Sequence, residues 1–151
     1  MKEINNPESS NLNSITVHFH KVKKIVTADW IKQIIYTILE TEQSYHQGAI
    51  SIVLVSDEYI TQLNKQFLDK NKPTDVLAFP WNEDYLWGEV YISVDRAQEQ
   101  SKYYQVNFTQ ELARLIIHGM LHLMGYDDQQ RDTKISMENR EEFYLEKMNM
   151  K

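Results

Sequence analysis

Residues 49–55 read AISIVLV and decide how the rest of the chain is arranged. The segment is rich in β-branched side chains, and apolar residues occupy both its odd and its even positions. A strand with this pattern is apolar on both faces, which is typical of a buried strand and not of a solvated edge. We therefore expect residues 49–55 to form a central strand.

Three further segments predict strands around this one. Residues 15–20, ITVHFH, alternate apolar and polar side chains, as an edge or half-exposed strand does. His18 and His20 fall on the polar side of this strand, where a solvated histidine is commoner than a ligand. Residues 76–79 and 89–93 flank a polar turn and predict a hairpin.

Helical periodicity predicts the remaining elements. Residues 29–40 place five apolar side chains on one stripe, with Thr27 or Asp29 as the cap, and residues 57–67 predict a shorter helix. Further helices are expected at 94–104, 109–124 and 135–148. The order β-α-β-α-β-β-α-α-α predicts an α+β fold, in which helices pack over a single mixed sheet of about four strands.

Length and composition limit the class of protein. The chain has 151 residues, of which 42% are hydrophobic, so we expect one domain over residues 14–151 behind a loose, polar N-terminal segment at 1–13. No apolar run is long enough to span a bilayer and no secretory signal is evident, which predicts a cytoplasmic protein without a membrane partner. The net charge of -6 argues against a general nucleic-acid coat. This net charge does not exclude a local basic groove.

Residues 111–128 read ELARLIIHGMLHLMGYDD and hold the candidate chemistry. His118 and His122 are four apart, so on a helix capped by Thr109 they lie on one side and can share an ion. Gly125 stands where a helix ends in a left-handed residue, so the chain can return toward the histidines. Asp128 then completes a three-ligand set with a position left for water. The chain has no Cys, so only His, Asp and Glu are available to hold a metal ion.

The residue after the first histidine limits the reaction. Zinc peptidases of the common helical kind carry a glutamate base there, and this chain has Gly119. An RNA substrate relaxes this requirement, because a metal ion can activate water and stabilise phosphoryl oxygens, and the 2′-hydroxyl is itself a potential nucleophile.

Residues 118–127, HGMLHLMGYD, resemble the signature of the YbeY family of endoribonucleases and rRNA maturation factors. Residues 73–80, PTDVLAFP, and 88–93, GEVYIS, resemble two further motifs of this family. The resemblance implies a single-strand-specific, metal-dependent endoribonuclease that matures the 3′ end of small-subunit rRNA and acts in ribosome quality control. It implies one zinc ion on His118, His122 and Asp128. The implied partners are single-stranded RNA, small-subunit rRNA and the ribosome, and not DNA.

Two positions depart from the family pattern. The third ligand is commonly His, whereas this chain has Asp128, with Asp127 as the competing ligand. A carboxylate is a good zinc ligand, so the site is expected to survive. Leu68 stands where the family commonly has Arg, which would clamp a phosphate, and Lys65, Lys70 and Lys72 are nearby in the sequence.

Several other residues are candidates for supporting roles. Asp75 opens a strand in a matching motif and is a candidate catalytic residue that orients a ligand or a water. Tyr126 either reaches the metal or packs beside the turn. Arg114 is expected to face away from the metal, toward solvent. Trp81 and Trp87 are candidates for base stacking or for packing.

Two other function classes stay open at this point. One is a ribosome-assembly factor that binds RNA and uses its metal structurally, and the other is a zinc peptidase-like hydrolase.

Overall fold

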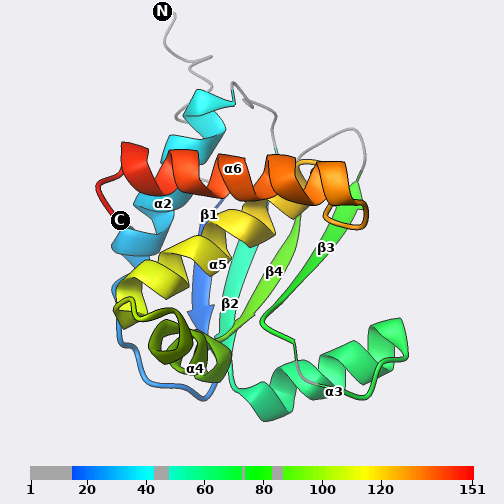
Figure 1. The fold of residues 1–151 in the computed structure, drawn as a ribbon. Helices are drawn as coiled ribbons and strands as arrows, with labels where there is room; N and C mark the ends of the chain where they lie inside the picture. Colours follow the sequence, from blue (N-terminus) through cyan, green and yellow to red (C-terminus); the bar gives the residue numbers. More distant parts are fainter. Residues whose placement is uncertain (1–14, 43–47, 73, 83–86) are drawn as a thin grey trace, which may run out of the picture.

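The computed structural model describes residues 15–42, 48–72, 74–82 and 87–151, and Figure 1 draws the fold. The expected element order is confirmed. The elements are β1 (Ile15–Phe19), α2 (Ala28–Thr41), β2 (Ile50–Val55), α3 (Asp57–Leu68), β3 (Val76–Asn82), β4 (Trp87–Ser93), α4 (Val94–Tyr104), α5 (Phe108–Leu123) and α6 (Arg131–Lys147). The predicted loose segment at 1–13 and the turn of the predicted hairpin lie outside the described residues.

The four strands form one mixed sheet in the order β1-β2-β4-β3. Strands β1, β2 and β4 run parallel, and β3 pairs antiparallel with β4. The predicted central strand is β2, which lies between β1 and β4, and the alternating strand β1 is at an edge, as its pattern indicated. The α+β fold class is thereby confirmed.

The sheet buries both of its faces against helices, but unequally. Ile52 and Leu54 belong to the larger core, which contains residues of α2, α4, α5 and α6. Val53 and Val55, which alternate with them along β2, face a smaller cluster that includes Ile60 of α3. Helix α3 therefore packs on the opposite face of the sheet from α2 and α5 and projects from it in Figure 1.

Helix α5 lies close against the sheet because Gly119 has no side chain. A Cβ atom at this position would be 2.4 Å from Cγ1 of Val90 and 3.1 Å from Cγ1 of Val76. The glycine therefore lets the backbone of α5 approach β4 and β3 at the level of the two motif histidines.

Helix α6 crosses α5, as Figure 1 shows. Hydrogen bonds and an ion pair connect α6 to the residue that follows α2. Glu42, which follows α2, accepts hydrogen bonds from Arg140 at 2.7 and 2.9 Å and from the hydroxyl of Tyr144. This ion pair joins two segments that are distant in the sequence. Among the described residues, the helices are all too short or too polar to cross a membrane.

Candidate metal centre

Helix α5 places His118 and His122 one turn apart. Asn107 caps the start of this helix: its side chain accepts a hydrogen bond from the Gln110 backbone N–H, and the Gln110 side chain accepts one from the Asn107 backbone N–H. The expected cap, Thr109, was wrong: it lies inside the helix and donates its hydroxyl to Asn107. Since four residues make about one helical turn, the two imidazole rings meet edge to face with their centroids 4.6 Å apart.

The chain reverses at Gly125, which has a φ of 99°. The Tyr126 N–H donates to the Leu121 carbonyl at 3.0 Å, and the Gly125 N–H donates to the His122 carbonyl at 3.1 Å. These two bonds are the Schellman pattern, which ends a helix in a left-handed residue. The reversal brings Asp128 back to the two histidines, as the sequence predicted.

In the described part of the chain, His118, His122 and Asp128 form a group able to hold a metal ion, with ligand atoms all within 4.8 Å of one another. The two Nε2 atoms are 3.1 Å apart, and Oδ2 of Asp128 is 3.8 Å from each. Asp127 instead accepts a hydrogen bond from the Gln129 N–H at 3.2 Å. The structure therefore brings together the three predicted ligands, whereas the competing aspartate, Asp127, makes a local hydrogen bond.

In both histidines, Nδ1 makes a hydrogen bond to a residue outside the three-ligand group. Nδ1 of His122 lies 3.1 Å from the Tyr126 carbonyl oxygen, and Nδ1 of His118 lies 2.5 Å from Oε2 of Glu141. An imidazole that donates through Nδ1 carries its lone pair on Nε2. Two lone pairs and a carboxylate then face one small space, which is unfavourable unless a cation or a proton sits among them. The donor set fits a divalent metal ion held by nitrogen and oxygen.

Burial and nearby acids set the protonation of the two rings. Burial would lower the pKa of His118, but the hydrogen bond and the charge of Glu141 raise it above its ordinary value. The charges of Asp75 and Asp128 raise the pKa of His118 further. Burial lowers the pKa of His122, and the charge of His118 lowers it further. These opposite shifts favour protonation of His118 over protonation of His122.

Glu141 is the residue of this centre that the sequence analysis missed. Its side chain is almost fully buried, and its second oxygen accepts from Nη1 of Arg114 at 3.2 Å. Its spacing of four residues from Met137 and from Leu145, which are both buried, is the sequence signal that places it on the inner side of α6. Glu141 is therefore a buried residue that holds the His118 ring, and not part of the solvated surface.

The expectation that Arg114 faces solvent was wrong. Its guanidinium donates to both oxygens of the buried Glu111, at 2.6 and 3.0 Å, and also to Glu141. Two buried carboxylates thus share one guanidinium, which leaves an excess negative charge behind His118. A protonated ring or a metal ion at His118 balances that excess.

Asp75 lies near the ligand group without joining it. Its carboxylate accepts from the Gln100 side chain at 3.3 Å, and its backbone carbonyl accepts from the Ser93 N–H. Its influence on His118 is through its charge. The hydroxyl of Tyr126 donates to Glu42 at 3.2 Å, so this residue packs beside the turn, and its carbonyl is the part that serves the centre.

Two of the remaining candidates are surface residues. Leu68 at the end of α3 and Trp81 on β3 are both exposed. The side chain of Trp87 lies outside the described residues. Gly119 has no space for the glutamate that a helical zinc peptidase needs, because Val90 fills the position of its Cβ.

The fold and the site define a class of protein, an α+β domain that presents a His-His-Asp group at the end of a sheet-packed helix. The family model described as "Endoribonuclease YbeY" matches residues 13–149. "Endoribonuclease YbeY" of Carboxydothermus hydrogenoformans is 43% identical over 98 residues, which are 62% of this chain and 68% of that protein. The protein of the same name from Chlorobium limicola is 33% identical over 128 residues, 84% of this chain and 88% of that protein.

A solved structure agrees with these matches. The solution structure of TM1509 from Thermotoga maritima superposes with a TM-score of 0.62 at 28% identity, covering 89% of this chain and 91% of that one. The chain belongs to the YbeY family. The resemblance seen in the sequence motifs is confirmed.

Proposed function

We propose that this protein is a zinc-dependent endoribonuclease that cleaves single-stranded RNA. Its proposed place is the maturation of the small-subunit rRNA 3′ end and ribosome quality control in the cytoplasm, where its partners are that rRNA and the ribosome. Membership of a family named for endoribonuclease activity supports the reaction class. The observation that carries the proposal is the convergence of His118, His122 and Asp128 on one small space.

The proposed zinc ligands are Nε2 of His118, Nε2 of His122 and a carboxylate oxygen of Asp128. When bound, zinc supplies a Lewis acid that stabilises charge on phosphoryl oxygens and activates water. Glu141 and the Tyr126 carbonyl hold the two rings so that both Nε2 atoms point at the same space.

Asp75 is proposed to orient a water or the RNA, as a catalytic residue outside the ligand set. Its charge already acts on His118, so it lies within electrostatic reach of the group.

The deciding experiment compares RNA cleavage after substitution of Asp128, which faces the histidines, and of its neighbour Asp127, which does not. A single-stranded RNA carrying the small-subunit 3′ end is incubated with zinc-loaded wild type, His122→Ala, Asp128→Asn and Asp127→Asn. We expect wild type and Asp127→Asn to cut, and His122→Ala and Asp128→Asn to lose cutting with their fold retained. Circular dichroism of all four proteins is the control for folding.

Two results would count against the proposal. Equal cleavage by Asp128→Asn and Asp127→Asn would remove Asp128 from the ligand set. Binding of the RNA without cleavage by wild type, with or without ribosomes, would make the metal a structural feature of an assembly factor.

A further inference from the structure

The face of the sheet on which α3 packs is only partly covered by the described elements. Leu77 of β3 is buried there with Val53 and Val55 against α3. On the same face, Thr16 and His18 of β1 are exposed, and Ser51 and Glu89 are half-buried. We call this surface the α3-side face. It lies opposite the α5 side, which carries the candidate metal centre.

A row of four aromatic side chains follows α3 across this face. The ring of Phe79 lies 5.6 Å from that of Phe67 and 5.9 Å from that of Tyr91, both edge to face. Tyr59 packs against the same apolar cluster as Phe79 and Tyr91. These four residues, Tyr59, Phe67, Phe79 and Tyr91, are the aromatic row. None of them is fully buried, and Phe67 is 55% exposed.

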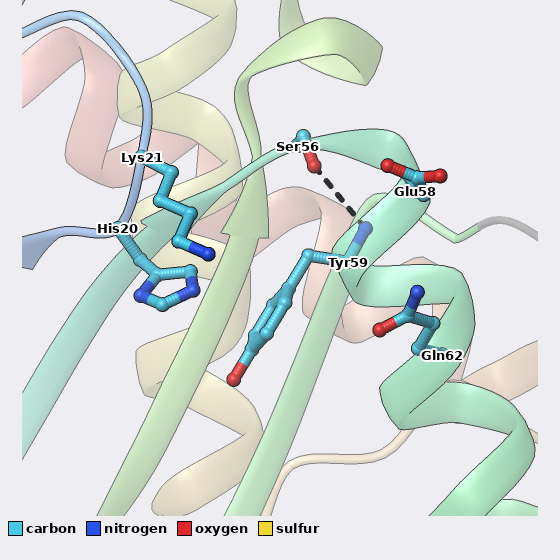
Figure 2. A pocket seen from close by; sticks show the side chains of 6 residues that line it. All are labelled: His20, Lys21, Ser56, Glu58, Tyr59 and Gln62. Atoms are coloured by element: carbon cyan, nitrogen blue, oxygen red, sulfur yellow. Dashed lines mark hydrogen bonds between the residues drawn. The ribbon is translucent and has the colours of Figure 1, made fainter.

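One end of the row opens into a hollow of about 240 Å³ between the loop after β1 and the first turns of α3. The hollow is lined by His20, Lys21, Ser56, Glu58, Tyr59 and Gln62. The rings of His20 and Tyr59 are 4.4 Å apart between centroids. Figure 2 shows the amine of Lys21 turned toward the same space as these two rings. The hollow thus combines flat aromatic surface and hydrogen-bonding groups with one cation, Lys21, and one acid, Glu58.

Positive charge gathers at the other end of the row. Residues 64–72 carry Lys65, Lys70 and Lys72, all exposed, against one acid, Asp69. This local excess of cations occurs in a chain whose net charge is -6. This end of the surface therefore favours an anionic partner that presents flat groups to the aromatic row, whereas the acids Glu58 and Glu89 lie elsewhere on the surface.

Single-stranded RNA has both properties. Its bases stack on aromatic side chains whatever their identity, and its phosphates pair with lysines. The bases of a duplex are already stacked on one another, so a duplex offers the row no free faces. An acidic peptide could supply the negative charge, but its carboxylate side chains offer no aromatic face to stack on the row.

We propose that the α3-side face binds single-stranded RNA, with bases stacked on the aromatic row and phosphates at Lys65, Lys70 and Lys72. This proposal deepens the proposed function, on which it rests. Leu68, 47% exposed beside Phe67, extends the apolar surface at the basic end. RNA is then held here by stacking on the aromatic row and by the charges of the lysines.

The test measures binding separately from cleavage by using the His122→Ala background. A fluorescently labelled oligouridylate is titrated with that protein and with the same protein carrying Phe67→Ala. The matched control is Tyr103→Ala, which removes an 81% exposed aromatic ring from α4. We expect Phe67→Ala to weaken binding by roughly 5-fold to 100-fold, as for loss of one stacking partner, and Tyr103→Ala to leave it unchanged.

Salt dependence tests the charges in the same proteins. Lys70→Ala is expected to reduce the slope of log affinity against log salt by roughly 0.7, and Lys102→Ala on α4 is its control. Crosslinking with 4-thiouridine RNA gives a second, independent location. We expect crosslinks on Phe67, Phe79 or Tyr91.

Equal affinity of Phe67→Ala and Tyr103→Ala would overturn the proposal and leave the row to a protein partner. Crosslinks confined to the α5 side would overturn it as well. Wild type that binds through the row yet never cleaves would instead refute the proposed enzyme while leaving the RNA surface in place.

Discussion

Glu141→Gln is predicted to weaken zinc binding at the centre while the protein stays folded. The substitution keeps the size of the side chain and removes its charge. Glu141 accepts on both oxygens, from Nδ1 of His118 and from Nη1 of Arg114. A glutamine offers only one acceptor oxygen, so in one of these two contacts the new NH2 group faces another hydrogen-bond donor.

The magnitude follows from burial and from the position of the contact. The carboxylate is 3% exposed, so water and salt screen it little. Groups that hold a metal-binding histidine through its other nitrogen typically change metal affinity by about 10- to 100-fold. That range corresponds to about 1.4–2.8 kcal/mol. Arg114 keeps its two bonds to Glu111, so the loss is expected in zinc affinity more than in folding.

The assay is a zinc titration against a chromophoric chelator, with wild type, Glu141→Gln and Glu138→Gln. Glu138 is exposed on the same helix, so its variant makes the same chemical change away from the centre. Thermal unfolding in excess chelator checks that all three proteins fold alike. Zinc affinity of Glu141→Gln equal to that of Glu138→Gln would falsify the support role of this carboxylate.

Three further predictions concern stability. Gly119→Ala should destabilise the fold by about 1–3 kcal/mol in urea unfolding, because its Cβ meets Val90; a gain of about 1 kcal/mol, as helix propensity alone predicts, would contradict the close packing. Burial would raise the pKa of Glu42, but its bonds from Tyr144 and Arg140 bring it below the ordinary 4.5. Glu42→Gln should therefore lower the free energy of unfolding by about 1–3 kcal/mol above pH 4.5, and this difference from wild type should disappear as the pH falls through the lowered pKa. A difference that does not change with pH would argue against this role of Glu42. Excess zinc at about 100 times its Kd should add about 2.7 kcal/mol to wild type, seen as a higher Tm that a chelator reverses, and should leave Asp128→Asn unchanged.

Most of the secondary structure could be predicted from the sequence because its signals are local. The alternating pattern of residues 15–20 and the two-faced apolar run at 49–55 correspond to the edge strand β1 and the central strand β2. The apolar stripe of residues 29–40 predicted α2, and of the two candidate caps, Thr27 and Asp29, the structure uses Thr27. The start of α6 was less well predicted: the helix begins at Arg131 and not at 135, because its polar first turns carry no apolar stripe.

The ligand group could also be predicted, since its members lie within eleven residues on one helix and the turn that follows it. A spacing of four and a helix-ending glycine are enough to bring His118, His122 and an aspartate together. Which aspartate faces the histidines depended on the path of the turn, where Asp127 is held by its bond to Gln129.

The support of the centre was decided by the tertiary structure alone. Glu141 lies 23 residues from His118 along the chain, and Glu42 lies 98 residues from Arg140. Local patterns carry no information about which distant helix crosses α5, so neither contact could be foreseen. The sequence determined the helices, the strands and the candidate metal-binding side chains, because these depend on neighbours in the chain. Only the packing of α6 over α5 decided which carboxylate holds His118, because that choice depends on neighbours in space.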